Sequence, residues 1–289
     1  MEKIYSTLVQ GCMGWGAWGA KLSVKEMADR IVKGVEMGIS TFDHADIYGD
    51  YTTEAEFGKA FKASGVRRED IQLITKCGIQ YVGKTRTNPI KHYQYDADYI
   101  IWSAERSLQD LGVSYLDLFL LHRPSPLMQA DEVAKAVEKL KADGKILSFG
   151  VSNFTPSQTD LIRQHVEVDA NQIEFSLTAH QAIWDGSLDH MQMHEISPMA
   201  WSPLGSYFGQ ESDQNKRIGE SLNKLSEKYS ASADQLLLAW ILKHPAGILP
   251  VIGTSSIDRM EKATAAVGIE LEVTDWFELL VASRGHKVP

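Results

Sequence analysis

Short apolar runs alternate along the chain with longer segments in which apolar residues recur every three or four positions. Seven of the runs read GISTFD (38–43), IQLITKC (71–77), LDLFLLH (116–122), ILSFGVS (146–152), DANQIEFS (169–176), SPMAWSPL (197–204) and GILPVIG (247–253). Nearly continuous apolar runs of this kind are typical of strands that are buried on both faces of a parallel sheet. With one further strand expected ahead of residue 23, the chain would have eight strands.

The segments between the runs predict helices. The first begins at Ser23, which forms the capping-box spacing with Glu26, and the others cover 53–61, 96–111, 129–142, a segment opening at Pro156, 231–244 and 255–267. A last helix and tail follow from about Thr274. Eight alternating units in 289 residues predict an α/β fold, a closed (β/α)₈ TIM barrel, as a single domain over residues 1–289.

The stretch GWGAWG at residues 14–19 matches G-x-G-x-x-G, the phosphate-binding turn of Rossmann folds. That turn works because its glycines open a helix directly, so that the free N–H groups of the first turn hold the pyrophosphate. Here the helix cap, Ser23, comes four residues after Gly19. We therefore interpret 14–19 as a Gly- and Trp-rich loop and not as a dinucleotide-binding turn.

The composition disfavours several classes of protein. The chain has 38 acidic and 29 basic side chains and a net charge of −9, so neither nucleic acid nor an anionic membrane is an expected partner. The start is too polar for a signal peptide, and no apolar run is long enough to span a bilayer. Cys12 and Cys77 fit neither a disulfide framework nor a zinc motif, which suggests a reducing compartment. A cytoplasmic protein is expected.

Polar residues follow three of the predicted strands. In a barrel of this type the chemistry gathers at the carboxyl ends of the strands, because the loops there converge on one mouth. The second strand ends in Asp43 and its loop carries Tyr48, the third ends in Lys76, and the fourth ends in His122. A buried carboxylate and a buried ammonium each cost several kcal/mol unless they are paired, so Asp43 and Lys76 are expected to pair.

These four residue types together suit the reduction of a carbonyl by an external hydride. A phenol is a poor proton donor at neutral pH unless a cation stabilises the phenolate, and Lys76 supplies such a cation for Tyr48. Tyr48 would then be the general acid that protonates a developing alkoxide, and His122 would donate a neutral hydrogen bond to the same oxygen.

Each residue taken alone has a simpler interpretation. Asp43 could cap a helix, Lys76 could be a solvated charge, and His122 could shape a turn with the Arg and Pro that follow it. His44 lies between two Asp residues, but on a strand its side chain points away from that of Asp43, so we interpret it as structural. No metal site is expected. A metal-dependent hydrolase on this barrel needs His pairs at the strand ends, and the predicted strands of this sequence do not end in such pairs.

Seven stretches, read together, resemble the motifs of the aldo-keto reductase family, in matching order along nearly the whole chain. They are GISTFDHADIYG, LITKCG, LLHRP, FGVSNF, NQIEFS, WSPLG and IGTSSIDR. The resemblance implies a (β/α)₈ barrel that binds a nicotinamide cofactor without a Rossmann domain. It implies a catalytic tetrad of Asp43, Tyr48, Lys76 and His122 and the reduction of aldehydes or ketones to alcohols. Bacterial oxidoreductases with HRP after the fourth strand are the most similar members.

The resemblance also implies the cofactor contacts. Ser152, Asn153 and Gln172 match residues that hydrogen-bond the nicotinamide carboxamide, and Trp201 matches a ring that stacks on the nicotinamide. The residues matching the phosphate-binding loops are Ser202, Leu204, Gly205, Gly253, Thr254, Ser255 and Ser256. Arg259 matches the arginine that holds the adenosine 2′-phosphate, which favours NADPH. Gly253, Lys262 and Ala263 depart from the family pattern of Lys, Glu and Asn, so NADH remains possible.

The substrate is expected to be a small-molecule carbonyl compound held by the variable loops. Trp15 and Trp18 would be flat apolar walls, with core packing of at least one as the alternative. The polar stretch 78–95 is basic and aromatic, so we expect it to cover the pocket and to tolerate polar or anionic carbonyls. A cofactor-binding regulatory subunit with little turnover is the alternative function. A monomer is expected by resemblance to the family.

Overall fold

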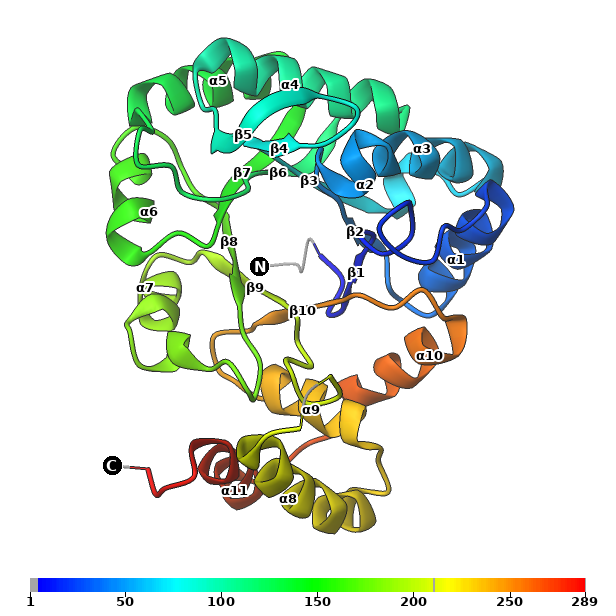
Figure 1. The fold of residues 1–289 in the computed structure, drawn as a ribbon, viewed down its shortest axis with the longest axis vertical. Helices are drawn as coiled ribbons and strands as arrows, with labels where there is room; N and C mark the ends of the chain where they lie inside the picture. Colours follow the sequence, from blue (N-terminus) through cyan, green and yellow to red (C-terminus); the bar gives the residue numbers. More distant parts are fainter. Residues whose placement is uncertain (1–4, 210, 289) are drawn as a thin grey trace.

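Eight parallel strands close into a barrel at the centre of the molecule (Figure 1). The computed structural model describes residues 5–209 and 211–288. The barrel strands are β1 (Val9–Gly11), β2 (Thr41–Asp43), β3 (Gln72–Cys77), β6 (Leu116–Leu121), β7 (Ile146–Ser152), β8 (Ala170–Glu174), β9 (Ser197–Trp201) and β10 (Leu249–Ile252). Their order around the barrel is β1-β10-β9-β8-β7-β6-β3-β2, and β1 pairs with β2 to close it. The predicted (β/α)₈ barrel is confirmed.

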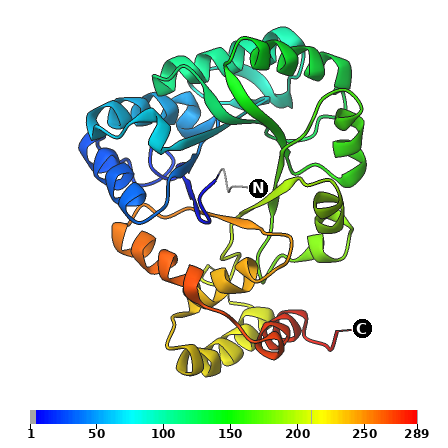
Figure 2. The same ribbon diagram turned by 180° about the vertical axis from the view of Figure 1, so that it is seen from behind.

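Helices surround the barrel on the outside (Figures 1 and 2). They are α1 (Val24–Glu36), α3 (Thr53–Ser64), α4 (Ala97–Leu111), α5 (Ala130–Ala142), α6 (Pro156–Arg163), α7 (Ser187–Met193), α9 (Ala233–Leu242) and α10 (Ile257–Ala265). The capping box of Ser23 and Glu26 opens α1, which confirms that the G-x-G-x-x-G stretch lies in a loop before the helix. None of the helices in the described parts of the chain is long and apolar enough to cross a membrane.

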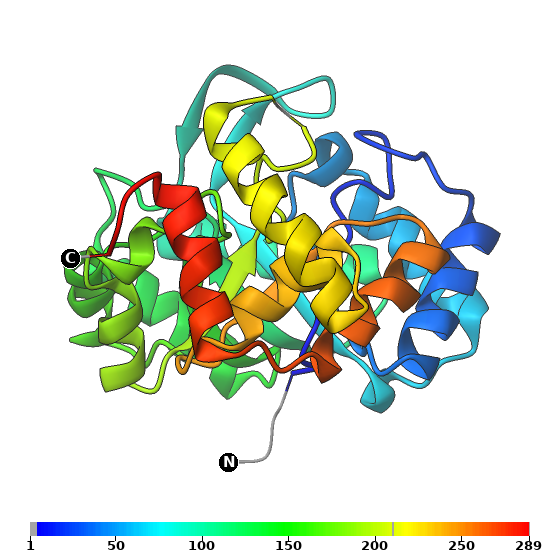
Figure 3. The same ribbon diagram turned by 90° about the horizontal axis from the view of Figure 1, so that it is seen from below.

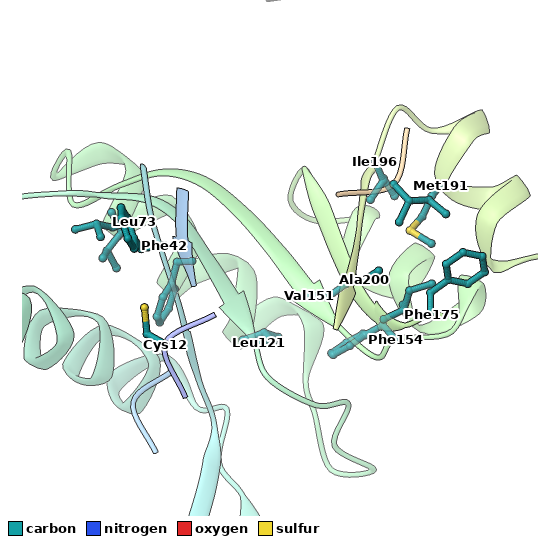
Figure 4. Packing of buried hydrophobic residues seen from close by; sticks show 14 of the residues in the cluster. Cys12, Phe42, Leu73, Leu121, Val151, Phe154, Phe175, Met191, Ile196 and Ala200 are labelled. Carbon is teal, nitrogen blue, oxygen red and sulfur yellow. The ribbon is translucent and has the colours of Figure 1, made fainter. Parts of the chain in front are cut away.

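Apolar side chains pack on both faces of the barrel sheet, as the continuous apolar runs predict. One layer lies inside the barrel and includes Val9, Ile74, Leu118, Leu120, Met199 and Val251. The other lies between the strands and the helices, where Figure 4 shows Phe42 beside Cys12, and Phe175 beside Met191 of α7. Because side chains fill the barrel interior, the space for a ligand lies at the strand ends and not along the barrel axis.

Several features of the fold were not predicted from the sequence, including helix α7 between β8 and β9. The stretch expected as a long polar segment contains an antiparallel hairpin of β4 (Ile79–Val82) and β5 (Thr87–Tyr93). A further helix, α8 (Asp213–Tyr229), lies beside the C-terminal helix α11 (Val273–Arg284), outside the ring of barrel helices (Figures 1 and 2). Figure 3 shows the hairpin and the start of α8 at the same end of the barrel.

Candidate active site

The four residues predicted from the strand ends lie together at the carboxyl ends of β2, β3 and β6. The Nζ of Lys76 donates to both oxygens of Asp43, at 2.8 and 2.7 Å, and to the hydroxyl of Tyr48 at 3.2 Å. It also donates to the carbonyl oxygen of His44 at 2.8 Å. Lys76 is fully buried and Asp43 is nearly so. An ion pair with this many hydrogen bonds tolerates such burial, whereas a single unpaired charge does not. The expected pairing of Asp43 with Lys76 is confirmed.

A tight turn after β2 directs Tyr48 toward Lys76. The three residues that follow, Gly49, Asp50 and Tyr51, have φ values of 63°, 59° and 66°, in the left-handed region. Gly49 accepts this conformation without strain, and a Cβ there would lie 2.4 Å from the hydroxyl oxygen of Thr53. Any other residue at position 49 would therefore displace either the turn or the start of α3.

Two opposing influences act on the protonation of Tyr48. Burial raises the pKa of the Tyr48 phenol, the charge of Lys76 acts to lower it, and the charge of Asp43 raises it further. The net pKa is raised, which is opposite to the shift expected from the sequence, because desolvation outweighs the nearby ammonium. Tyr48 is therefore a neutral phenol that holds its proton at physiological pH.

Lys76 keeps its charge despite its complete burial. Burial acts to lower the pKa of its ammonium group, but the charge of Asp43 and then the neighbouring Tyr48 outweigh it, and the net pKa is raised. An ammonium group at this position can stabilise negative charge on the Tyr48 oxygen.

His122 completes the group as a neutral ring. Burial lowers the pKa of its imidazole well below the ordinary value, and the charges of Lys76, Arg123 and Lys91 add to the effect. The His122 ring centroid lies 6.1 Å from that of Tyr48, and its Nδ1 is buried without a hydrogen-bond partner among the described residues. A neutral imidazole can donate one hydrogen bond to an oxygen placed between it and the Tyr48 hydroxyl.

His44 takes no part in this group. Its ring is fully buried against Phe57, with the ring centroids 4.2 Å apart, and burial lowers the pKa of its imidazole to about 3. The two free cysteines, Cys12 and Cys77, are also buried, and burial raises the pKa of both thiols. All three side chains are packing residues, as the sequence suggested for His44.

A cavity of about 460 Å³ opens above these residues. Asp43, Tyr48 and His122 line it, as do the predicted cofactor residues Ser152, Asn153, Gln172, Trp201, Ser202 and Gly253. The polar side chains among them are linked by hydrogen bonds. Trp201 Nε1 donates to Asn153 Oδ1 at 2.9 Å, Asn153 Nδ2 donates to Ser152 Oγ at 2.8 Å, and Gln172 Nε2 donates to Asp43 Oδ1 at 2.9 Å. The network orients amide groups next to the Asp43 and Lys76 pair.

Two of these cofactor candidates have strained backbones. Asn153, directly after β7, has a φ of 63°, and Ser202, directly after β9, has a φ of 50°. Left-handed conformations are uncommon outside glycine and tend to cluster at functional sites, where the surrounding structure holds them. The strain at both positions coincides with the rim of the cavity.

A second cavity, of about 290 Å³, continues from the first through Ser202, Pro203 and Gly253, which line both. Its lining includes Leu204, Gly205, Thr254 and Arg259, all predicted from the sequence as cofactor residues, and also Asp234. Ser256 caps α10 by accepting from the N–H of Arg259, so this cavity adjoins a helix amino terminus. Ser255 lines neither cavity, and its carbonyl oxygen accepts from the side chain of Arg30.

The two candidate pocket tryptophans have different positions. Trp18 lines the first cavity and lies against Tyr81, with ring centroids 5.3 Å apart. Trp15 was assigned to the pocket wrongly, since it is fully buried, packs against Phe42 and Phe57, and donates from Nε1 to the carbonyl oxygen of Thr254. The turn after β1 directs its indole toward β2 and α3, so Trp15 belongs to the core.

The β4–β5 hairpin is fastened to the barrel mouth. The Arg86 guanidinium lies 3.6 Å from the ring centroid of Tyr51 and 4.0 Å from Asp46 Oδ2. The Asp50 carboxylate accepts from the backbone N–H groups of Lys84 and Thr85 at the hairpin tip. These contacts join the hairpin to the same left-handed turn that positions Tyr48.

Two basic residues at the mouth were not predicted as site residues. Lys91 of β5 and Arg123, which follows His122, line the first cavity, and neither forms an ion pair within the described part of the chain. Arg123 lies 5.5 Å from the ring centroid of Trp201. The position of Arg123 directly after a catalytic candidate was a usable signal, whereas the inward placement of Lys91 depends on the unpredicted hairpin.

The comparisons with known proteins agree along the full length of the barrel. The sequence profile of the Aldo/keto reductase family matches residues 7–279. The chain is 38% identical to Oxidoreductase YdhF of Escherichia coli in an alignment of 294 positions that covers 99% of this chain and 96% of that protein. It is 38% identical to a 6-dehydroglucose reductase of Agrobacterium fabrum in an alignment of 283 positions that covers 95% of this chain and 94% of that protein.

A solved structure agrees with the fold. The crystal structure of an aldo/keto reductase from Klebsiella pneumoniae in complex with NADP and acetate superposes with a TM-score of 0.78 at 26% sequence identity, covering 99% of this chain and 93% of that chain. One assignment follows from the profile match, the closed barrel and the order of the motifs. It also agrees with the grouping of Asp43, Tyr48, Lys76 and His122. The chain belongs to the aldo/keto reductase family.

Proposed function

We propose that the protein reduces aldehydes or ketones to alcohols with NADPH and that Tyr48 is the general acid. The observation that carries the proposal is the contact of Lys76 Nζ with both the Asp43 carboxylate and the Tyr48 hydroxyl at the floor of a cavity. An alkoxide is a stronger base than a phenolate, so a neutral Tyr48 can give up its proton as negative charge develops on the substrate oxygen. Lys76 then stabilises the phenolate that is left.

His122 would orient the carbonyl oxygen. Its ring is neutral at physiological pH, because burial and three nearby cations lower the pKa of the imidazole. It would donate a hydrogen bond that strengthens as the oxygen becomes negative, which stabilises the transition state more than the bound substrate. Tyr48 and His122 together would hold the oxygen from two sides.

The residues present fit a nicotinamide dinucleotide, which supplies the hydride when it is bound. Ser152, Asn153 and Gln172 offer both hydroxyl and amide groups to a carboxamide, and Trp201 offers an aromatic face. The second cavity would take the phosphates, because it adjoins the amino terminus of α10 and carries Arg259 on its rim. The contiguity of the two cavities matches the extended shape of such a cofactor.

Arg259 is expected to set the preference for NADPH. Replacing Arg259 with Ala should weaken NADPH binding by about 10- to 100-fold, the loss expected for one charge-assisted hydrogen bond to a phosphate, and should leave NADH binding nearly unchanged. Titration of tryptophan fluorescence with each cofactor measures both affinities. Lys262→Ala is the matched control, because Lys262 lies on α10 but does not line the cavity. Equal losses for NADPH and NADH would show that Arg259 does not read the 2′-phosphate.

We expect the preference for NADPH over NADH to be modest. Asp234 lines the same cavity as Arg259, and its negative charge opposes the binding of the negatively charged 2′-phosphate of NADPH there. Positions 253 and 263, which carry longer side chains in the family pattern, are Gly and Ala here. Asp234 and the absence of a lysine at position 253 reduce the positive charge that would discriminate the two cofactors, and Ala263 offers no polar group in place of an asparagine.

The mouth of the cavity favours polar or anionic carbonyl compounds. Lys91 and Arg123 line it without acidic partners among the described residues, in a protein whose net charge is −9. Trp18, Met13 and Ile79 add an apolar wall. Two of the relatives are named 6-dehydroglucose reductase, so a sugar bearing an aldehyde belongs in the first substrate panel.

A charge change at the mouth tests this preference. Arg123→Gln is expected to lower kcat/KM for succinic semialdehyde by roughly tenfold, because one charge-assisted contact is lost, and to change kcat/KM for its uncharged methyl ester much less. Lys84→Gln is the matched control, since Lys84 lies at the hairpin tip and does not line the cavity. The hypothesis fails if wild-type protein does not distinguish the acid from the ester.

A further inference from the structure

We propose that Asp160, His190 and His194 form a binding site for a divalent zinc ion on the outside of the barrel. Asp160 belongs to α6, His190 belongs to α7, and His194 caps the end of α7. None of the three lines either cavity of the proposed reductase site. The inference therefore does not depend on the proposed catalytic function.

The three potential ligand atoms are close enough to share one ion. His190 Nε2 lies 2.8 Å from Asp160 Oδ1, His194 Nε2 lies 3.9 Å from the same oxygen, and all three atoms lie within 4.8 Å of one another. Zinc binds nitrogen and oxygen ligands at about 2.0–2.1 Å, so tetrahedral ligands lie about 3.3 Å apart. The separations span that value, and rotation of the partly exposed Asp160 and His194 side chains would bring them closer to it.

The helix geometry explains why both imidazoles face Asp160. The His190 N–H donates to the Gly186 carbonyl and the His194 N–H donates to the His190 carbonyl, so α-helical hydrogen bonding continues through this pair. Residues four apart lie on one helical face, and the two ring centroids are 4.6 Å apart. Two histidines at this spacing with a carboxylate from a neighbouring element make a ligand set that suits zinc.

The partial exposure of the proposed ligands would leave one coordination position of the ion open to water. The His190 side chain is only 10% exposed, whereas those of His194 and Asp160 are 29% and 48% exposed. His194 also lines a polar surface cavity whose three carboxylates, Glu167, Asp169 and Glu195, outnumber its one guanidinium, Arg163, so the route of entry for a cation carries a net negative charge. A three-ligand site with an exposed fourth position is the arrangement expected here.

A purely structural hydrogen bond explains only part of the arrangement. The contact between His190 and Asp160 would by itself fasten α6 to α7, and Arg163 contacts Asp160 at 3.4 Å within α6. It gives no role to His194, whose ring lies against that of His190 with its Nε2 facing the same carboxylate oxygen. A shared ion uses all three residues and joins the two helices more firmly, since the metal binds the folded chain preferentially.

Zinc titration of the untagged protein tests the site. After removal of metals with a chelator, wild-type protein is expected to bind one Zn²⁺ per chain at micromolar concentration by calorimetry, with a rise in melting temperature. His194→Ala and Asp160→Asn should each lose at least about tenfold in affinity, since even changes next to a metal ligand commonly cost that much. Co²⁺ should give visible absorption that is lost in the same variants.

The matched control is His165→Ala, because His165 is exposed, lines the polar cavity beside His194 and is not a ligand in this proposal. It should bind Zn²⁺ as wild type does. Three results would overturn the proposal: no stoichiometric binding by wild type, unchanged affinity in His194→Ala and Asp160→Asn, or an equal loss in His165→Ala. Circular dichroism of each variant separates loss of the site from loss of the fold.

Discussion

Replacement of Lys76 with Met is expected to lower the free energy of unfolding by about 3–5 kcal/mol and to abolish measurable carbonyl reduction. The variant leaves Asp43 as a buried carboxylate whose main partner is gone, and breaking a buried ion pair from one side has about this cost. It also removes the cation beside the Tyr48 hydroxyl, so the phenolate formed during proton transfer loses its stabilisation. Urea denaturation and steady-state turnover measure the two effects.

The double variant Asp43→Asn with Lys76→Met separates stability from catalysis. With both charges removed, the free energy of unfolding should recover most of its loss, because a neutral pair of similar volume carries little desolvation cost. Turnover should stay at the level of Lys76→Met. If the double variant regains activity as well as stability, Lys76 has only a structural role and the proposed mechanism is wrong.

Replacement of Tyr48 with Phe is expected to lower kcat by about 10²- to 10⁴-fold, the usual contribution of a general acid. The phenyl ring fills the same volume, and Lys76 keeps its ion pair with Asp43 and its bond to the His44 carbonyl, so the fold should be unchanged. The cofactor contacts proposed for Ser152, Asn153, Gln172 and Trp201 do not involve the Tyr48 hydroxyl. NADPH affinity, measured by quenching of tryptophan fluorescence, should therefore equal that of wild type.

Tyr115→Phe provides the matched control for the loss of a phenol hydroxyl. Tyr115 lies just before β6, at the amino end of that strand and away from the cavity. Its replacement should leave kcat within about twofold of wild type, because surface changes of this kind have small effects. Similar losses of kcat in both variants would point to a general destabilisation and not to proton transfer.

The sequence was sufficient to predict the barrel and the Asp43 and Lys76 pair, because both follow from local patterns. A strand buried on both faces has a continuous apolar run, and the carboxyl ends of parallel strands meet at one mouth, so Asp43, Lys76 and His122 could be placed together without coordinates. The capping box at Ser23 likewise showed where the first helix begins and excluded the dinucleotide turn.

The elements that were missed show weaker patterns. Strand β5 of the hairpin is mostly exposed and polar, so it shows no regular alternation, and the two strands of the hairpin pair with each other. Helix α8 has Ile218, Leu222 and Leu225 at helical spacing, but together with Asn215 they form only a narrow buried stripe among many charged residues. The wrong assignment of Trp15 has a similar cause, since an indole fits a core or a pocket equally well and tertiary packing decides between them.

The direction of the Tyr48 pKa shift could not be read from the sequence. The spacing of residues shows that an ammonium will be near the phenol, but it does not show how much water is excluded from both. In the structure burial is the largest influence on the pKa of Tyr48 and raises it above the ordinary value. In the proposed mechanism Lys76 would therefore stabilise the phenolate during the reaction and would not ionise the phenol beforehand.

Single-turnover oxidation of bound NADPH by an aldehyde tests the central claim most directly, because it observes the chemical step without product release. Wild-type protein mixed with a reactive aldehyde is predicted to oxidise one NADPH per chain and to form one alcohol. The Tyr48→Phe variant, saturated with the same cofactor, should react at least about a hundredfold more slowly. Equal single-turnover rates in the two proteins would contradict the assignment of Tyr48 as the proton donor.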